Sequence, residues 1–282
     1  MLKQRLLTAL ILIPLAVGWM FFLPFDYFTL GAVLICLLAS REWGRFVWPE
    51  QPSWLALPMG GVLAVTLFLA PTSHLLSMSI PVWVEGILVA GALWWLFAVW
   101  MVVRYPRSAS CWRTSRWLKA GFGLLTLLPF FWAMLLLRSY QYAQDTQYGG
   151  WALFFVMLLV WCADSGAYFC GRALGRHKLM PAVSPKKTIE GLLGGLVLAT
   201  AVAAITAYGF LTADENRLAV IVSAVLAVLA SVLGDLAESL FKREAGLKDS
   251  GSLLPGHGGV LDRIDSLTAA LPVFVISYLL LS

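Results

Sequence analysis

Long apolar segments recur along this chain, and they restrict its fold more than any other feature of the sequence. A helix needs about 20 consecutive apolar residues to cross a bilayer, and a composition of 60% hydrophobic and 12% charged residues is too apolar for a soluble globule. We therefore expect an all-α polytopic integral membrane protein, a single membrane domain over residues 1–282 with about nine transmembrane helices. The predicted spans are residues 6–23, 27–40, 55–70, 83–103, 118–137, 149–163, 190–211, 217–234 and 267–281.

The basic residues predict how these helices are oriented. If the N-terminus is cytoplasmic, all of the 20 Lys and Arg residues except Arg138 and Arg217 fall on the cytoplasmic side, as the positive-inside rule requires. This uneven division favours an odd number of spans, and eight is the alternative if the first two form a re-entrant pair. The net charge of +5 then reflects topology and indicates no nucleic-acid partner.

Two other features of the sequence have ordinary membrane explanations. Tryptophans with flanking charge are typical interfacial anchors, which is how we interpret residues 41–43 and the tryptophans at 83, 94, 95, 100, 112 and 117. The segment 104–119 has five basic residues and no acidic one. Such a loop attracts anionic lipid, although positive-inside topology alone also explains it.

Charged residues are concentrated in one stretch, residues 234–266. Its first four polar side chains stand at i, i+3, i+4 and i+7, so a helix places them on one face; they are Asp235, Glu238, Ser239 and Lys242. Asp262 and Asp265 stand just before the last apolar segment. Ionisable groups at membrane depth are costly and usually functional, and clustered carboxylates suit Mg²⁺. The alternative is a solvated structural loop.

A glycine-rich turn lies between these two groups of acidic residues. Lys248 and Asp249 precede it, and His257 stands beside Gly258 and Gly259. Because glycines remove side chains where a backbone has to approach a ligand closely, this turn suits contact with a phosphate.

A second polar region, residues 164–191, follows the sixth predicted span. Asp164 ends that span, and the run Ser-Pro-Lys-Lys-Thr at 184–188 comes immediately before a helix that we expect to start near Glu190. Ammonium groups, hydroxyls and the free N–H groups of a helix start together form an anion site. Basic loops before spans are also common without any function. Gly191 and Gly195 form a small-xxx-small pair that favours close helix packing.

Several fixed-spacing motifs in these regions resemble one family. The runs SLFKR (239–243), KDSG (248–251) and LPGHGGVLDRID (254–265) look like the signature of phosphatidate cytidylyltransferases, also called CDP-diacylglycerol synthases. DSGAY (164–168) and SPKKT-x-EG (184–191) are similar to further elements of that family. The resemblance covers the two polar segments, and the first half of the chain is supported only by its span pattern.

The resemblance implies an enzyme that transfers a cytidylyl group from CTP to phosphatidate, giving CDP-diacylglycerol and pyrophosphate. The clustered carboxylates predict Mg²⁺ as cofactor, with one ion or two left open. The apolar spans predict a lipid bilayer as surroundings. The family resemblance implies a homodimer as the assembly. We expect the active site to face the cytoplasm from a bacterial inner membrane.

The residues that match the motifs give the candidate site. The predicted metal ligands are Asp235, Asp262 and Asp265, with Asp164, Asp249 and Glu238 as further ligands or partners of ligands. The predicted catalytic residues are Asp235, Lys248, Asp249, His257, Asp262, Arg263 and Asp265. The predicted substrate-binding residues are Asp164, Ser184, Lys186, Lys187, Thr188, Glu190, Lys242 and Arg243.

Two other functions stay open at the level of sequence. Intramembrane carboxylates with basic neighbours also build ion or proton pathways in transporters, but here the polar groups gather on one predicted side and the span centres lack charge. A transferase that acts on a polyprenol or an archaeal ether lipid would use the same headgroup chemistry.

Overall fold

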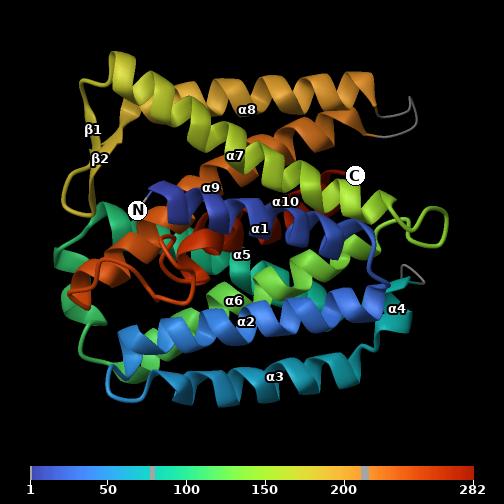
Figure 1. Ribbon diagram of the computed structural model, residues 1–282, viewed down its shortest axis with the longest axis horizontal. Coiled ribbons are helices and arrows are strands. Elements are labelled where there is room, and N and C mark those ends of the chain that lie inside the picture. Colours follow the sequence, from blue (N-terminus) through green and yellow to red (C-terminus); the bar gives the residue numbers. More distant parts are fainter. Residues whose placement is uncertain (1, 77–79, 211–215) are drawn as a thin grey trace.

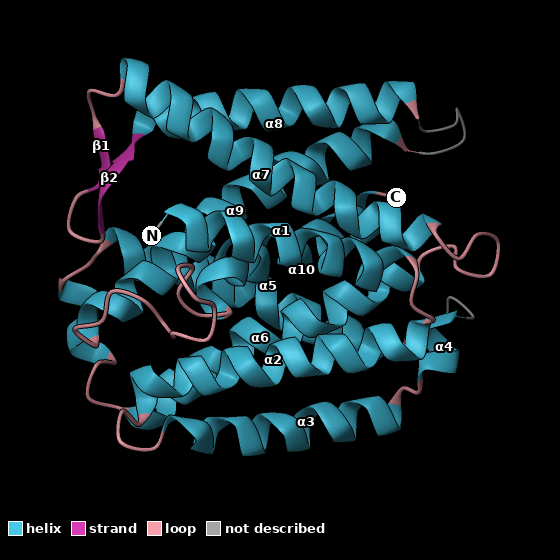
Figure 2. Ribbon diagram, viewed as in Figure 1, coloured by secondary structure: helices cyan, strands magenta, loops and turns pink. Residues whose placement is uncertain are grey.

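Helices lie side by side along the long axis of the molecule, and one short hairpin projects from an end (Figures 1 and 2). The computed structural model describes residues 2–76, 80–210 and 216–282, with side chains from residue 10 onward. The elements in chain order are α1 (Leu2–Phe21), α2 (Phe25–Val47), η1 (Pro52–Leu55), α3 (Ala56–Leu69), α4 (Thr72–Leu76), α5 (Val82–Val103), η2 (Arg107–Cys111), α6 (Arg116–Ser139), α7 (Tyr148–Leu174), β1 (Lys178–Met180), β2 (Ser184–Thr188), α8 (Ile189–Gly209), α9 (Arg217–Glu244) and α10 (Leu261–Leu281).

The helices agree with the predicted membrane class. Each of the nine predicted spans overlaps a helix. Within the described residues, seven helices are long and apolar enough to cross a membrane, and α1 contributes a shorter apolar stretch, Leu10–Phe21. α2 falls outside the seven, because its final turns carry Arg41, Glu42 and Arg45. The count of nine and the side on which the N-terminus lies stay predictions.

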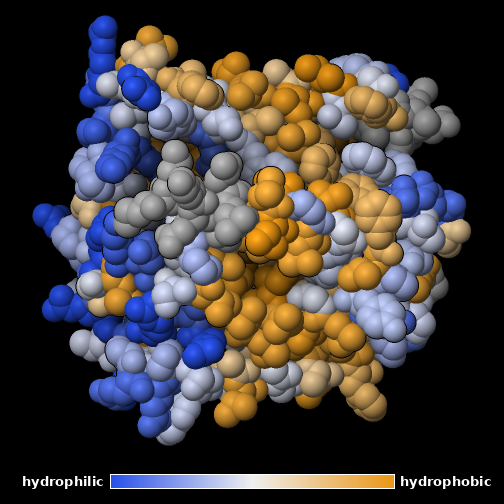
Figure 3. All heavy atoms as spheres, in the orientation of Figure 1, coloured by the Kyte–Doolittle hydropathy of each residue, from blue (hydrophilic) through white to orange (hydrophobic). Residues whose placement is uncertain are grey.

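The helices α6, α9 and α10 lie in the interior of the bundle. Phe130, Phe131 and Trp132 of α6 are buried, as are Ala269 and Leu271 of α10. The outermost helices, α3 and α8, instead expose large apolar side chains, a pattern that suits a lipid solvent. Figure 3 shows apolar side chains across the middle of one face and hydrophilic ones gathered towards the left end.

α7 and α8 approach closely because glycines line their contact. A Cβ added to Gly195 would collide with the carbonyl oxygen of Ala163, and one added to Gly191 would reach 2.9 Å from the carbonyl oxygen of Ala167. Gly166 of α7 faces Gly194 in the same way. The predicted close packing at Gly191 and Gly195 is therefore confirmed.

The two ends of the bundle differ in charge. The hairpin, the α5–α6 connection and the α9–α10 connection lie at the left end in Figure 1. The opposite end contains Arg138 and Arg217, the two residues assigned to the outside. Arg138 is buried, lies over the Phe28 and Tyr142 rings, and donates to the Thr146 carbonyl.

Three helices run further into the polar regions than their apolar segments suggest. α7 continues past Asp164 to Leu174, α9 continues past Asp235 to Glu244, and α2 continues to Val47. Helical hydrogen bonds continue through polar residues as readily as through apolar ones. The end of an apolar segment therefore indicates where a helix leaves the lipid, and the helix itself ends further along the chain.

Candidate active site

The C-terminal part of α9 presents one polar face, as its spacing predicts. Lys242 Nζ lies 2.6 Å from Glu238 Oε2 and 2.8 Å from Asp262 Oδ1 of α10. The Ser239 hydroxyl donates to Asp235 Oδ1 at 3.2 Å. Lys242 therefore joins the two helices that carry the predicted acidic residues.

Asp262 is fully occupied by hydrogen bonds within the protein. Besides the Lys242 ammonium, its carboxylate accepts the Ser250 N–H at 2.9 Å and the Gly259 N–H at 2.8 Å. A carboxylate saturated in this way fixes the α9–α10 loop to the first turn of α10.

Glu238 of α9 and Asp265 of α10 are two acidic groups that influence one another at the α9–α10 interface. Glu238 is only 4% exposed, so water screens its interaction with Asp265 poorly. Glu238 Oε1 has no hydrogen-bond donor among the described residues. Because two facing carboxylates repel one another, this pair needs a shared proton or a cation.

The hairpin β1–β2 brings the second predicted segment against the first. Its strands are antiparallel, with Lys178 opposite Thr188 and Met180 opposite Ser184. Lys187 Nζ forms an ion pair of 2.6 Å with Asp235 Oδ2 of α9. Thr188 caps α8 by accepting the Gly191 N–H. The predicted segments 164–191 and 234–266 therefore contact one another.

A cavity of about 380 Å³ lies beside this ion pair. Asp164, Arg172, Lys186 and Lys187 supply its charged side chains, and Tyr168 and Thr188 supply hydroxyls. Glycines and apolar side chains form the rest, and the larger apolar ones are Leu179, Leu192, Leu196, Val228 and Val232. Its lining thus combines the groups that suit a phosphate with those that suit a hydrocarbon chain.

Glu190, a predicted substrate-binding residue, has partners within the protein. It lies in the first turn of α8, where its carboxylate contacts His177 Nδ1 at 2.6 Å and accepts the Arg176 and His177 N–H groups. In this arrangement Glu190 closes the connection between α7 and the hairpin.

The remaining predicted residues surround the site at greater exposure. Arg243 donates to the Val183 carbonyl at 3.3 Å, and Ser184 is half-buried at the start of β2. His257 follows the turn by donating its N–H to the Leu254 carbonyl at 2.9 Å. Lys186, Lys248, Asp249 and Arg263 are exposed.

The glycine-rich turn accommodates carboxylates of the protein itself. Gly258 has a φ of +84°, and a Cβ there would reach 2.7 Å from Asp262 Oδ2. A Cβ at Gly259 would collide with the Glu42 carboxylate. The missing side chains of these two glycines therefore leave room for Asp262 and Glu42, and the approach of a phosphate to this turn stays a prediction.

Residues from the first part of the chain complete the site, and the sequence interpretation missed them. Glu42 accepts the Val260 N–H at 3.0 Å and the Leu261 N–H at 2.7 Å, while Arg45 donates to the Ser250 carbonyl at 2.6 Å. The only sequence signal was a pair of charges continuing the helical pattern of an apolar span, which an anchor explains equally well.

The anchor interpretation is wrong for several aromatic residues. Trp43 is buried against Phe241, and its Nε1 donates to the Lys119 carbonyl. Trp94, Trp95 and Trp112 are also buried. Trp100 and Trp117 are exposed, as the interpretation requires.

The basic connection 104–119 is partly structural. Lys119 donates to the Phe46 carbonyl at 2.7 Å and so satisfies the end of α2. Burial raises the pKa of the Tyr105 phenol, and a hydrogen bond to Glu244 raises it further. The four arginines of this connection are exposed, so they remain accessible to anionic lipid; they are Arg104, Arg107, Arg113 and Arg116.

The predicted magnesium site can be tested against the donor atoms present. Among the described residues, no three His, Cys, Asp or Glu side chains already take the arrangement of a metal site. The unpartnered Glu238 Oε1 nevertheless lies beside Asp265, which Asp235 also influences electrostatically. Carboxylate oxygens of this kind fit a hard divalent cation, whereas the oxygens of Asp262 are already in use.

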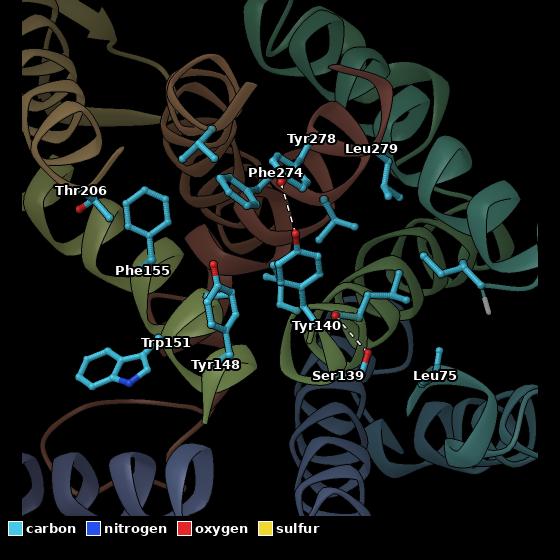
Figure 4. Close-up of a pocket in the computed structure, with 16 residues that line it drawn as sticks. Leu75, Ser139, Tyr140, Tyr148, Trp151, Phe155, Thr206, Phe274, Tyr278 and Leu279 are labelled. Carbon is cyan, nitrogen blue, oxygen red and sulfur yellow. Dashed lines mark hydrogen bonds between the residues drawn. The ribbon is translucent and has the colours of Figure 1, made fainter. Parts of the chain in front are cut away.

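A second cavity, of about 350 Å³, lies at the opposite end of the bundle (Figure 4). Figure 4 shows the hydroxyls of Tyr140 and Tyr278 pointing towards one another, 3.5 Å apart, with Tyr148 beside Tyr140. Trp151 and Phe155 line the same space. Because none of its described lining residues is charged, this cavity does not suit a triphosphate.

Comparison with known proteins places the chain among lipid-modifying enzymes. The model of the cytidylyltransferase family matches residues 3–281. The chain is 43% identical to the phosphatidate cytidylyltransferase of Haemophilus influenzae over 286 residues, which cover 99% of each chain. It is 42% identical to that of Pseudomonas aeruginosa, over 97% of this chain and 96% of the relative. Identity to that of Bacillus subtilis is 32%, over 96% and 95%.

Proposed function

Because the chain belongs to the cytidylyltransferase family, we propose that its polar end transfers a cytidylyl group from CTP to phosphatidate and releases pyrophosphate. One observation carries the assignment of the site. The Lys187–Asp235 ion pair joins the two segments that resemble this family, and it does so beside a cavity of suitable character.

The cavity accounts for the choice of substrates. Its basic wall, with Lys186 and Lys187, attracts the triphosphate of CTP, and the capped start of α8 adds the positive end of a helix. Its apolar wall accepts the first part of the acyl chains of phosphatidate. The nucleotide then enters from water, and the lipid enters from the bilayer.

The reaction is a displacement at phosphorus. An oxygen of the phosphatidate phosphate bonds to the α-phosphorus of CTP, the bond from that phosphorus to the bridging oxygen of pyrophosphate breaks, and the electron pair leaves with pyrophosphate. Both reactants are anionic, so the site has to neutralise the reacting and departing oxygens. Lys187 serves this purpose by moving from Asp235 to a phosphate. The phosphate of phosphatidate is already largely ionised at neutral pH, so a general base is not required.

We place the magnesium ion between α9 and α10. Asp235, Asp265 and the unpartnered oxygen of Glu238 would hold it, and Asp262 is the predicted ligand whose oxygens would first have to leave their hydrogen bonds. A divalent cation there supplies charge neutralisation at the reacting phosphates. A cation bound to Asp235, Glu238 and Asp265 would also hold the end of α9 against the start of α10 when Lys187 leaves Asp235 for a phosphate.

The surroundings follow from the orientation predicted by the basic residues. We propose that the polar end faces the cytoplasm of a bacterium from its inner membrane, and that the protein forms a homodimer. Labelling of Lys178→Cys in sealed vesicles, in a variant whose four native cysteines are replaced by Ser, tests the orientation. Light scattering in detergent tests the assembly.

Purified protein in detergent is the direct test of the activity. We expect CTP labelled at the α-phosphate, Mg²⁺ and phosphatidate to give a labelled liponucleotide and one equivalent of pyrophosphate. Absence of product across a range of lipids and cations would contradict the enzyme assignment. A related transferase would instead use a polyprenyl phosphate or an ether-linked lipid phosphate in place of phosphatidate. A transporter would give ion flux in liposomes that contain only the protein.

A further inference from the structure

Glu42 is a buried carboxylate that belongs to none of the motif segments. It lies near the end of α2, is 6% exposed, and receives hydrogen bonds from a part of the chain more than 200 residues away. Its Oε1 accepts the Val260 N–H at 3.0 Å, its Oε2 accepts the Leu261 N–H at 2.7 Å, and the Ser250 hydroxyl donates to Oε2 at 3.4 Å.

These contacts supply a cap that α10 lacks in its own sequence. The residue at the N-cap position is Val260, whose side chain has no acceptor. Free N–H groups and the positive end of the helix dipole favour a carboxylate at this place. Glu42 thus acts as the N-cap of α10 from a different helix.

The glycines of the α9–α10 loop are explained by the same carboxylate. A Cβ at Gly251 or at Gly259 would collide with Glu42. Arg45, one turn further along α2, donates to the Ser250 and Asp249 carbonyls at 2.6 and 3.3 Å. The end of α2 therefore holds the loop through both of its charged side chains.

We infer that Glu42 is a positioning residue of the transferase, which fixes the start of α10 so that Asp262 and Asp265 face α9. This inference rests on the proposed function of those two residues. The N–H of Leu261 directly precedes Asp262, and Asp265 follows one turn later, so a shift of the helix start displaces both carboxylates. It also follows that the N–H groups of Val260 and Leu261 are occupied by the protein and do not bind substrate phosphate.

Hydrogen exchange of the protein without substrate tests the contact independently of activity. In Glu42→Gln, an amide nitrogen faces the Val260 or Leu261 N–H, so we expect exchange in peptides covering 258–262 to become at least about 10-fold faster. Glu85→Gln, at the start of α5, is the matched control and keeps wild-type exchange. Unchanged exchange in Glu42→Gln would overturn the inference even if the enzyme is active.

Kinetics then separate positioning from a general loss of folding. Supporting residues around a metal or catalytic site typically contribute about 10- to 100-fold, so we expect kcat of Glu42→Gln to fall by that factor while KM for CTP changes little. If Glu42→Gln does not fold, Glu42→Asp, whose carboxylate lies one methylene further back, takes its place with the same expectation. A wild-type kcat in the variant that folds would overturn the inference.

A double-mutant cycle with Gly259 tests whether Glu42 occupies the space beside this glycine. Gly259→Ala alone collides with Glu42, whereas the collision is absent when residue 42 is Ala. We therefore expect the combined Glu42→Ala and Gly259→Ala variant to melt no lower than the Gly259→Ala variant, so that the two effects are strongly non-additive. Additive losses of melting temperature would overturn the inference. Failure of the wild type to make liponucleotide would instead count against the proposed function.

Discussion

Lys187 of the hairpin and Asp235 of α9 form an ion pair of 2.6 Å in which each side chain is about one-quarter to one-third exposed (26% and 31%). The contact joins a strand that follows α7 to a helix that begins some thirty residues later. Because both partners remain accessible, a phosphate or a cation is able to replace either one. We therefore expect the pair to hold the substrate-free site together and to separate when substrate binds.

Substitution of Lys187 tests this exchange of partners. In Lys187→Met, we expect kcat/KM for CTP to fall about 100-fold, because one charge-assisted contact to a developing phosphate charge is lost. Steady-state kinetics measure the change. Lys178→Met replaces an exposed lysine of the same hairpin and keeps the wild-type value; an equal loss in both variants would indicate that general basicity of the hairpin matters and not this ion pair.

Asp265→Asn tests the acidic pair at the α9–α10 interface. The substitution keeps the shape of the side chain and removes its charge, so we expect turnover to drop by about 10³-fold while the melting temperature stays close to that of the wild type. Asp26→Asn at the opposite end of the bundle is the control with full activity. A variant with wild-type rate and wild-type dependence on Mg²⁺ would exclude Asp265 as a ligand.

Removal of divalent cations tests the metal directly. We expect dialysis against a chelator to abolish formation of liponucleotide and addition of Mg²⁺ to restore it. Ca²⁺ prefers longer oxygen distances and higher coordination numbers, so it should restore less activity. Full turnover in the chelated enzyme would remove the cation from the mechanism.

Gly195→Val tests the close packing of α7 and α8. The new side chain collides with the Ala163 carbonyl, and overpacking of this kind costs about 1–3 kcal/mol or more. We expect a lower melting temperature and weaker activity, because Asp164 and the start of α8 move apart. Gly209→Ala is the control, since a Cβ at Gly209 meets nothing within 4 Å; equal melting temperatures would contradict the packing argument.

The parts of this fold that depend on local spacing could be predicted from the sequence. The common face of Asp235, Glu238 and Lys242 follows from helical periodicity alone, and the apolar segments identify the helices. The hairpin could not be predicted in this way, because Ser184–Thr188 contains a proline and two lysines and lacks the alternation of a strand. The hairpin connects α7 to α8, and contacts with α9 hold it in place.

The parts that depend on contacts distant in sequence could not be predicted. Glu42 and Trp43 follow an apolar segment, so nothing local separates a membrane anchor from a buried cap. Asp262 matches the family motif, yet its hydrogen bonds to Lys242, Ser250 and Gly259 come from two other parts of the fold. Resemblance to a family identifies such residues without distinguishing a ligand from a support.

The cap that Glu42 provides for α10 has a consequence for biosynthesis. The ribosome makes this carboxylate 218 residues before the Val260 N–H that it binds, so every other helix enters the membrane while the acid still lacks its partner. An unpaired buried carboxylate is unfavourable, and we expect the end of α2 to remain in water until the last helix is inserted. We therefore expect activity to appear only after α10 has been inserted and has met the end of α2.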